Sequence, residues 1–182
     1  MKKQKKGNPV IGCLSLIIII LCIVFIVNIL TNESSNIDKS LDIEIDPTSL
    51  TLEELVDYAV DKTRVEKEKI TINNDLGKGE GKIIRIDLKG KSRITTNSTR
   101  NNMFMEATDI FKILQGNEEI SSVTIWWSLE LVDTYGNISE PNVMRIHIDK
   151  ETLDKINFEN FNFNNILTVA DSYFEHPIFR ED

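Results

Sequence analysis

The longest apolar stretch of the chain runs from Val10 to Leu30 and contains no charged residue. About twenty such residues suffice for an α-helix to cross a hydrocarbon core of roughly 30 Å. Four lysines in residues 1–9 precede the stretch, and the segment that follows it is mostly acidic. The positive-inside rule then puts the amino terminus in the cytoplasm and the rest of the chain outside. The pattern predicts a cytoplasmic basic tail over residues 1–9 and a single-pass transmembrane anchor over residues 10–30.

Three other interpretations of this stretch are less favoured. A secretory signal peptide has an apolar region of about 7–15 residues followed by small residues at its cleavage site, whereas bulky Ile29 and Leu30 end this one. Val10–Cys13 resembles a bacterial lipobox, but that motif closes the apolar region of a lipoprotein and here it opens the region. A type IV prepilin carries a glutamate near the fifth position of its mature helix, and no acidic residue lies between Gly7 and Asn32.

Beyond a polar, acidic tether over residues 31–49, periodic patterns continue to the end of the chain. Helical spacing is found over residues 52–60, 101–117, 150–156 and 166–174, and strand alternation over residues 69–73, 82–90, 120–132 and 143–149. Thr51 and Glu54 form a capping box at the first of these helices. The order α-ββ-α-ββ-αα predicts one extracytoplasmic α+β domain over residues 50–182, in which an antiparallel sheet of about four strands is covered by helices.

Alternation along the last two strand patterns divides their side chains between two faces of the sheet. The face expected to meet the helices carries Val123, Ile125, Trp127, Leu129, Leu131, Met144, Ile146 and Ile148. The opposite face is expected to carry Thr124, Trp126, Ser128 and Glu130 beside Arg145, His147 and Asp149. Trp126 and Trp127 are neighbours on one strand, so one ring belongs to the core and the other is half exposed.

The exposed tryptophan has two interpretations. In the first, the helix over residues 166–174 or the aromatic loop over residues 157–165 covers Trp126. In the second, Trp126, Arg145 and His147 form a recognition face, because Trp, Tyr and Arg are over-represented at the energetic centres of protein interfaces.

Charge narrows the range of partners. The chain has 21 basic and 29 acidic residues, and removal of the four tail lysines leaves 17 against 29, or −12. Such a domain repels nucleic acid and anionic membrane surfaces. Both cysteines, Cys13 and Cys22, lie in the apolar stretch, so no disulfide is expected in the outside domain. Small secreted animal domains are commonly stabilised by disulfides, and the composition therefore favours a bacterial envelope.

Motifs for chemistry are missing from the sequence. A zinc site needs three or four ligands of suitable type, and the outside domain has two histidines, His147 and His176, without the H-E-x-x-H spacing. Neither a G-x-S-x-G elbow nor a phosphate-binding loop occurs. Gly77–Lys82 joins two strand patterns and is expected to be a hairpin turn. Asp133–Asn137 lacks the alternation of a calcium loop and is also expected to be a turn. The sequence thus predicts no cofactor, no metal and no catalytic residue.

Three segments bear a likeness to known proteins. The segments SSVTIWWSLELVDTYGN, VMRIHIDKETLDKINFENF and VADSYFEHPIF resemble the carboxy-terminal part of small, single-pass envelope proteins of low-GC Gram-positive bacteria. The resemblance covers about the last half of the chain. It implies an extracytoplasmic location and a shared fold, and it brings no assigned chemistry.

We therefore expect a membrane-anchored, non-enzymatic accessory protein of the bacterial envelope that presents its α+β domain to a protein partner. An exclusion or immunity factor from a phage or mobile element, acting in the same envelope, is one alternative. A metal-independent envelope hydrolase is the other.

Overall fold

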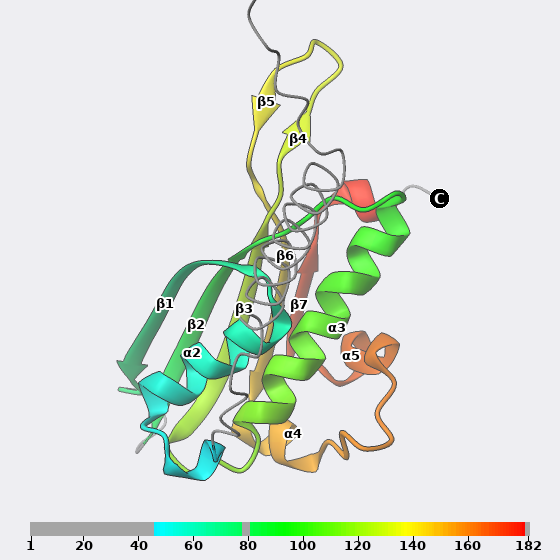
Figure 1. Cartoon of the computed structure of the whole chain (residues 1–182). Helices are drawn as coiled ribbons and strands as arrows, with labels where there is room; N and C mark the ends of the chain where they lie inside the picture. Colours follow the sequence, from blue (N-terminus) through cyan, green and yellow to red (C-terminus); the bar gives the residue numbers. More distant parts are fainter. Residues whose placement is uncertain (1–45, 78–80, 181–182) are drawn as a thin grey trace, which may run out of the picture. The chain divides into compact units, whose positions relative to one another are not determined.

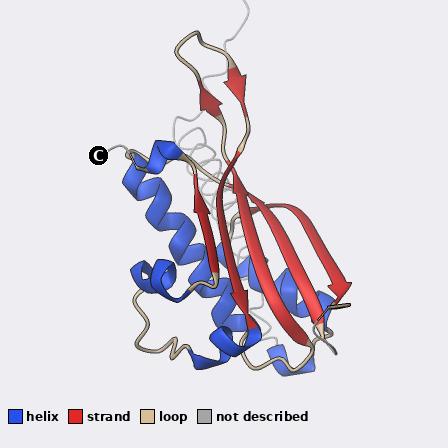
Figure 2. Cartoon of the chain, turned by 180° about the vertical axis from the view of Figure 1, so that it is seen from behind, coloured by secondary structure: helices blue, strands red, loops and turns tan. Residues whose placement is uncertain are grey.

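A mixed sheet of five strands forms the centre of the domain, and helices lie against one of its two faces (Figure 1). The computed structural model describes residues 46–77 and 81–180. The strand order is β1-β2-β3-β6-β7, and β4 pairs with β5 in a separate two-stranded sheet. The view from behind shows the second face of the large sheet without a helix over it (Figure 2).

The elements follow one another along the chain with these bounds. They are η1 (Pro47–Ser49), α2 (Leu52–Thr63), β1 (Glu66–Asn74), β2 (Lys82–Lys89), α3 (Thr96–Leu114), β3 (Ile120–Ser128), β4 (Leu131–Val132), β5 (Ile138–Ser139), β6 (Asn142–Asp149), α4 (Lys150–Lys155), η2 (Phe163–Asn165), α5 (Ile166–Val169), β7 (Ser172–Glu175) and η3 (Pro177–Phe179).

Helix α2 begins at the capping box that the sequence predicts. The backbone N–H of Thr51 donates to the Glu54 carboxylate at 2.9 Å, and the Glu54 N–H donates to Thr51 Oγ1 at 3.4 Å. These two bonds satisfy backbone donors that a helix start otherwise leaves free. Helix α3 has the same arrangement between Thr95 and Ser98, and it therefore starts at Thr96, five positions before the predicted helix.

The prediction of an antiparallel sheet with about four strands is wrong. Strands β1 and β2 form an antiparallel hairpin, as do β3 and β6, but β2 and β3 lie side by side in parallel. Helix α3 is the cause, because its 19 residues rise about 28 Å and the eight residues of β2 extend about 26 Å. The chain thus returns to the starting end of β2 before β3 begins, as a parallel pairing requires.

The segment 166–174, predicted to be one helix, is divided between two elements. Helix α5 ends at Val169, and Ser172–Glu175 forms β7, an edge strand that pairs antiparallel with β6. Tyr173 packs against the core on the helix-covered face, while Ser172 lies on the opposite face. The fifth strand of the sheet comes from this segment.

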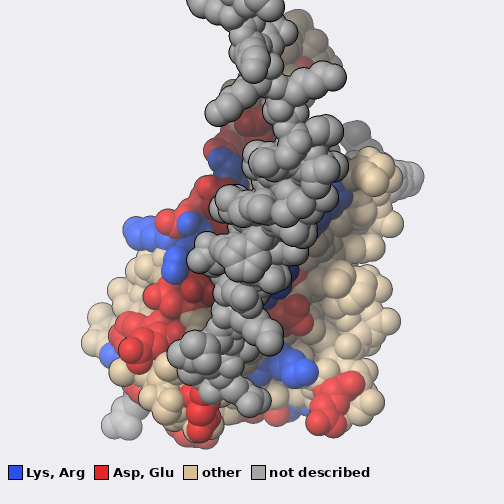
Figure 3. Space-filling view, viewed as in Figure 1, with Lys and Arg blue, Asp and Glu red and all other residues tan. Residues whose placement is uncertain are grey.

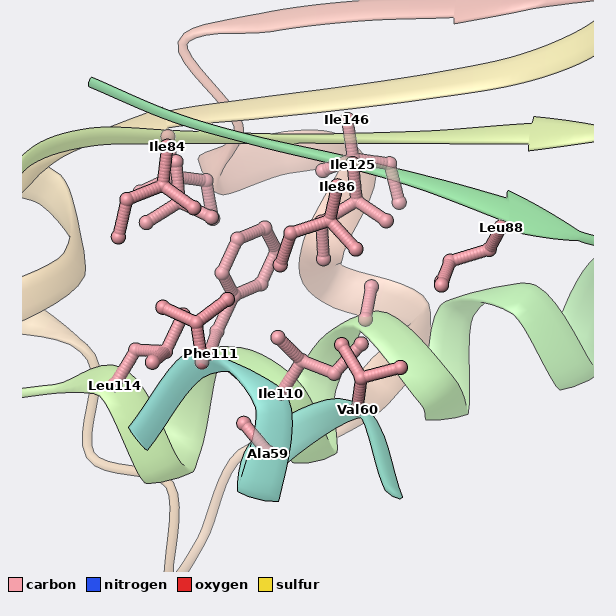
Figure 4. Close-up of a cluster of buried hydrophobic side chains, with 14 of the residues drawn as sticks. Ala59, Val60, Ile84, Ile86, Leu88, Ile110, Phe111, Leu114, Ile125 and Ile146 are labelled. Carbon is pink, nitrogen blue, oxygen red and sulfur yellow. The ribbon is translucent and has the colours of Figure 1, made fainter. Parts of the chain in front are cut away.

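The core lies between the sheet and helices α2 and α3 (Figure 4). Figure 4 shows Ile84, Ile86 and Leu88 of β2 with one isoleucine each from β3 and β6, facing side chains of both helices. The residues labelled there, all 0% exposed, are Ala59, Val60, Ile84, Ile86, Leu88, Ile110, Phe111, Leu114, Ile125 and Ile146. This packing fixes the central strands, and with them the side chains on the opposite face.

The helix-covered side carries acidic and basic side chains next to one another (Figure 3). An ion pair between Lys67 and Asp57 is one example of this mixture. The charged side chains visible on this side are therefore of mixed sign.

No helix within residues 46–77 and 81–180 has the length and apolar character needed to cross a membrane. The anchor predicted over residues 10–30 lies outside the described residues, as do the tail and most of the tether. Where the tether meets the domain, the Asp46 carboxylate accepts a hydrogen bond of 2.9 Å from the Thr48 N–H and caps η1. The described structure thus begins at Asp46 and includes the last residues of the predicted tether.

Candidate binding site on the open sheet face

The open face is the side of the five-stranded sheet that no helix covers (Figure 2). It contains a depression of about 440 Å³. Every strand of the large sheet contributes to its lining, which consists of Thr71, Asn73, Ile83, Arg85, Thr124, Trp126, Arg145, His147 and Ser172. The three residues proposed from the sequence, Trp126, Arg145 and His147, all lie in this one depression.

The two tryptophans of β3 lie on opposite faces, as alternation predicts. Trp127 is 0% exposed in the core, whereas Trp126 is half-buried in the depression. Neither candidate cover lies over Trp126, because Phe161 of the aromatic loop and Leu167 of α5 pack against the core on the helix side. Within the described domain, the Trp126 ring therefore belongs to an open surface.

Trp126 lies between two arginines that come from the strands on either side of β3. Arg85 belongs to β2 and Arg145 to β6, and the Cζ atom of each is 5.3 Å from the centroid of the Trp126 ring. Arg145 is the direct cross-strand partner of Trp126. Both distances are in the range of cation–π attraction, so the three side chains hold one another on the sheet surface.

The two arginines differ in how their charges are compensated. Arg85 Nε lies 2.9 and 3.1 Å from the two carboxylate oxygens of Asp87, and its Nη2 lies 2.8 Å from Oδ1 of the same residue. Arg145 Nη2 donates instead to the hydroxyl of Ser172 at 2.8 Å. Its buried Nε has no partner among the described residues, and no carboxylate there forms an ion pair with it. Arg145 is thus held in place without an ion pair to any described residue.

His147 is fixed by two neighbours at the side of the depression. Its Nδ1 and the Thr124 hydroxyl share a hydrogen bond of 2.8 Å, and its Nε2 lies 3.3 Å from a carboxylate oxygen of Asp149. The result is a hydroxyl–imidazole–carboxylate string across β3 and β6.

Sequence reasoning missed Arg85 and Ser172. The alternation of β2 does put Arg85 on the polar face of its strand, but its closeness to Trp126 depends on the parallel pairing of β2 with β3. Ser172 reaches Arg145 because β7 pairs with β6. Neither pairing follows from local pattern alone.

The Asp133–Asn137 segment is a turn, as predicted, at the tip of the β4–β5 hairpin. The Asp133 carboxylate accepts hydrogen bonds of 2.8 Å from the N–H groups of Tyr135 and Asn137, and one of 2.9 Å from the Asn137 side chain. These bonds, with that from the Asn137 side chain foremost, lower the pKa of Asp133 below its usual value. Gly136, at φ +83°, takes the left-handed position of the turn.

Other predicted features do not line the depression. His176 caps η3 by accepting a 3.2 Å hydrogen bond from the Ile178 N–H, consistent with a packing role. In the loop from Gly77 to Lys82, residues 78–80 lie outside the described residues, and Asp75 N–H donates to Gly81 O across it at 2.9 Å. Within the described chain, no group of three His, Cys, Asp or Glu residues is placed to hold a metal ion.

The chain was compared with protein-family models, with curated proteins and with solved structures. None of the three comparisons finds a match. The geometry of the open face is therefore the basis on which a function is assigned.

Proposed function

We propose that this protein is a membrane-anchored accessory protein of the bacterial envelope, and that the open face of its sheet binds a protein partner. The membrane location rests on the apolar segment 10–30 and the lysines before it. The resemblance of the last half of the chain to envelope proteins of low-GC Gram-positive bacteria belongs to the same proposal.

The observation that carries the binding role is the depression in which Trp126 lies between Arg85 and Arg145. Tryptophan and arginine are the side chains most often found at the energetic centres of protein interfaces. Here they stand on the central strands of a sheet whose other face is packed core. Because the site is pre-organised, little conformational freedom is lost when a partner binds, and more of the contact energy remains as affinity.

The string Thr124–His147–Asp149 bears on the hydrolase alternative. A hydroxyl, an imidazole and a carboxylate in this order have the residue types of a nucleophile, a base and an orienting group. Acyl transfer also needs N–H donors aimed at the developing oxyanion, and the backbone donors of central strands such as β3 are used in the sheet ladder. The string therefore favours a fixed surface for binding over a catalytic site.

In-cell cross-linking of the full chain tests the binding role. A photoreactive amino acid is placed at Asn73, at the rim of the depression, and for the control at exposed Glu53 on α2. We expect a discrete protein adduct from position 73 and none from position 53. Trp126→Ala in the position-73 protein should abolish the adduct. Adducts of the same size from both positions, or an adduct that survives Trp126→Ala, would remove the open face as the binding site.

The location has a separate test. Protease added to wall-stripped cells should digest the domain of residues 50–182 while leaving a membrane-bound fragment. A domain that stays protected until the membrane is dissolved would show that the proposed orientation is wrong.

A further inference from the structure

We propose that the depression binds a carboxylate from an acidic segment of the partner, and that Arg145 is the residue that holds it. The inference rests on the proposed function, because it names the chemistry that the open face recognises. It follows from the difference between the two arginines beside Trp126.

Of the two arginines in the depression, Arg145 is the one that forms no ion pair with a described residue. The charge of Arg85 is balanced by the Asp87 carboxylate, which meets Nε and Nη2 along one edge of the guanidinium. Arg145 makes one hydrogen bond within the described domain, to the neutral hydroxyl of Ser172, and its Nε is buried without a partner there. A buried donor without an acceptor is unfavourable. Because the Nε atom is closed to solvent, an anion in the depression compensates the charge through the terminal nitrogens of the guanidinium.

The guanidinium of Arg145 is also oriented before any ligand arrives. The Trp126 ring lies against it at 5.3 Å, and Ser172 fixes one of its terminal nitrogens. A planar, oriented guanidinium matches the two oxygens of a carboxylate and can bind them through parallel hydrogen bonds. The oriented guanidinium therefore suits a single planar anion such as a carboxylate.

The nature of the partner follows from charge and from the apolar lining. The whole chain carries −8, so its net charge repels a polyanion such as nucleic acid, whereas one carboxylate needs a single cation. Ile83 and Trp126 line the same depression and offer apolar surface beside Arg145. A glutamate or aspartate next to an apolar side chain, on an exposed segment of a protein, satisfies both parts of the site.

Side-chain NMR of the full chain in detergent micelles tests this assignment. The probes are the blocked dipeptides acetyl-Glu-Leu-amide and acetyl-Gln-Leu-amide, which have nearly the same shape and differ in whether the first side chain ends in a carboxylate or a neutral carboxamide. We expect the Glu peptide to shift the Arg145 Nε–H and Trp126 indole signals in a saturable manner, and to bind at least about tenfold more tightly than the Gln peptide, as a charge-assisted pair predicts. The Arg145 signal is identified by its loss in Arg145→Gln.

Three variants sharpen the test. Arg145→Gln should lower the affinity for the Glu peptide about tenfold. Arg145→Lys keeps the charge but loses the planar fork, so its affinity should lie between those of Arg145→Gln and wild type. Lys62→Gln removes an equal charge from α2 and should leave the titration unchanged. Circular dichroism of each variant separates lost binding from lost folding, and Arg145→Lys retains the test if Arg145→Gln unfolds.

The outcomes separate this inference from the proposed function. Equal binding of the two peptides, or full binding by Arg145→Gln, overturns the carboxylate site even when the adduct at position 73 forms. A selective response to the Glu peptide without any protein adduct supports the carboxylate site and removes the protein partner. Failure of both experiments removes both proposals.

Discussion

The indole Nε1 of Trp127 donates a hydrogen bond of 2.9 Å to Oε2 of Glu106, so a carboxylate on α3 meets the wholly buried tryptophan of β3. Burial raises the pKa of Glu106 above its usual value, although hydrogen bonds from Trp127 and Asn102 oppose this shift. The contact joins α3 to the sheet, and its contribution to the free energy of unfolding depends on whether Glu106 is charged.

Glu106→Gln should retain stability at pH 7, because the amide oxygen can still accept the Trp127 bond and no buried charge remains. Glu106→Ala leaves the indole donor unpaired and should cost about 1–3 kcal/mol. Since the folded-state pKa is raised, the stability linked to protonation is present below about pH 4.5 and is lost as pH rises through the folded value. Urea unfolding from pH 4 to 7 should therefore show wild type losing stability relative to Glu106→Gln. A constant difference between the two proteins would contradict this.

The two neighbouring tryptophans should respond very differently to truncation. Trp127→Ala removes a fully buried ring and should cost about 3–5 kcal/mol. Trp126→Ala removes a half-buried ring and two arginine contacts, each worth about 0.5–1 kcal/mol at exposed sites, so we expect a loss of about 1–2 kcal/mol. Thermal and urea unfolding of the two variants measure both values. Equal large losses would mean that the Trp126 ring is as important to the fold as the Trp127 ring.

Tyr173 should make the domain sensitive to alkali. Burial, and then the hydrogen bond to the Glu175 carboxylate, raise the pKa of the Tyr173 hydroxyl above its usual value. A raised folded-state pKa gives stability that is complete below about pH 10 and falls as pH rises above it. Tyr173→Phe should remove this fall. Unfolding of both proteins between pH 8 and 11 is the measurement, and parallel curves would count against the assignment.

Glu175 has two arginine neighbours that provide a matched pair of substitutions. Arg100 Nε lies 2.8 Å from its carboxylate and both side chains are mostly buried, whereas Arg180 lies 3.8 Å away and is 62% exposed. Arg100→Gln should cost about 1.5–3 kcal/mol, as expected for a hydrogen bond to a charged group. Arg180→Gln should cost less than about 1 kcal/mol. The opposite ranking would show that the edge strand β7 is anchored by the carboxy-terminal tail.

Local chain geometry explains the parts of the fold that the sequence predicts well. The Thr51 capping box needs four consecutive residues, and the separation of Trp126 from Trp127 follows from the two-residue period of a strand. The pairing of β3 with β6 is a hairpin, so the sequence brings Trp126 and Arg145 together without knowledge of the rest of the sheet.

Features that depend on the path of the chain could not be derived in this way. The parallel neighbour β2 is set by the return of α3, which determines that Arg85 reaches Trp126. Strand β7 has four residues, too few to distinguish a two-residue period from a helical one. Its pairing with β6 depends on the tertiary packing of the chain. That pairing makes Ser172 part of the site.

The composition of the depression from all five strands has a consequence for the biogenesis of the protein. Thr71 comes from the first strand and Ser172 from the last, so the surface is complete only after the most distant segments of the domain have met. Such non-local contacts form slowly and late in folding. A chain that has been cleaved before β7, or that has not finished folding, lacks the hydrogen bond from Arg145 to Ser172 that orients the guanidinium. The complete depression therefore exists only in copies that have finished folding and have kept β7.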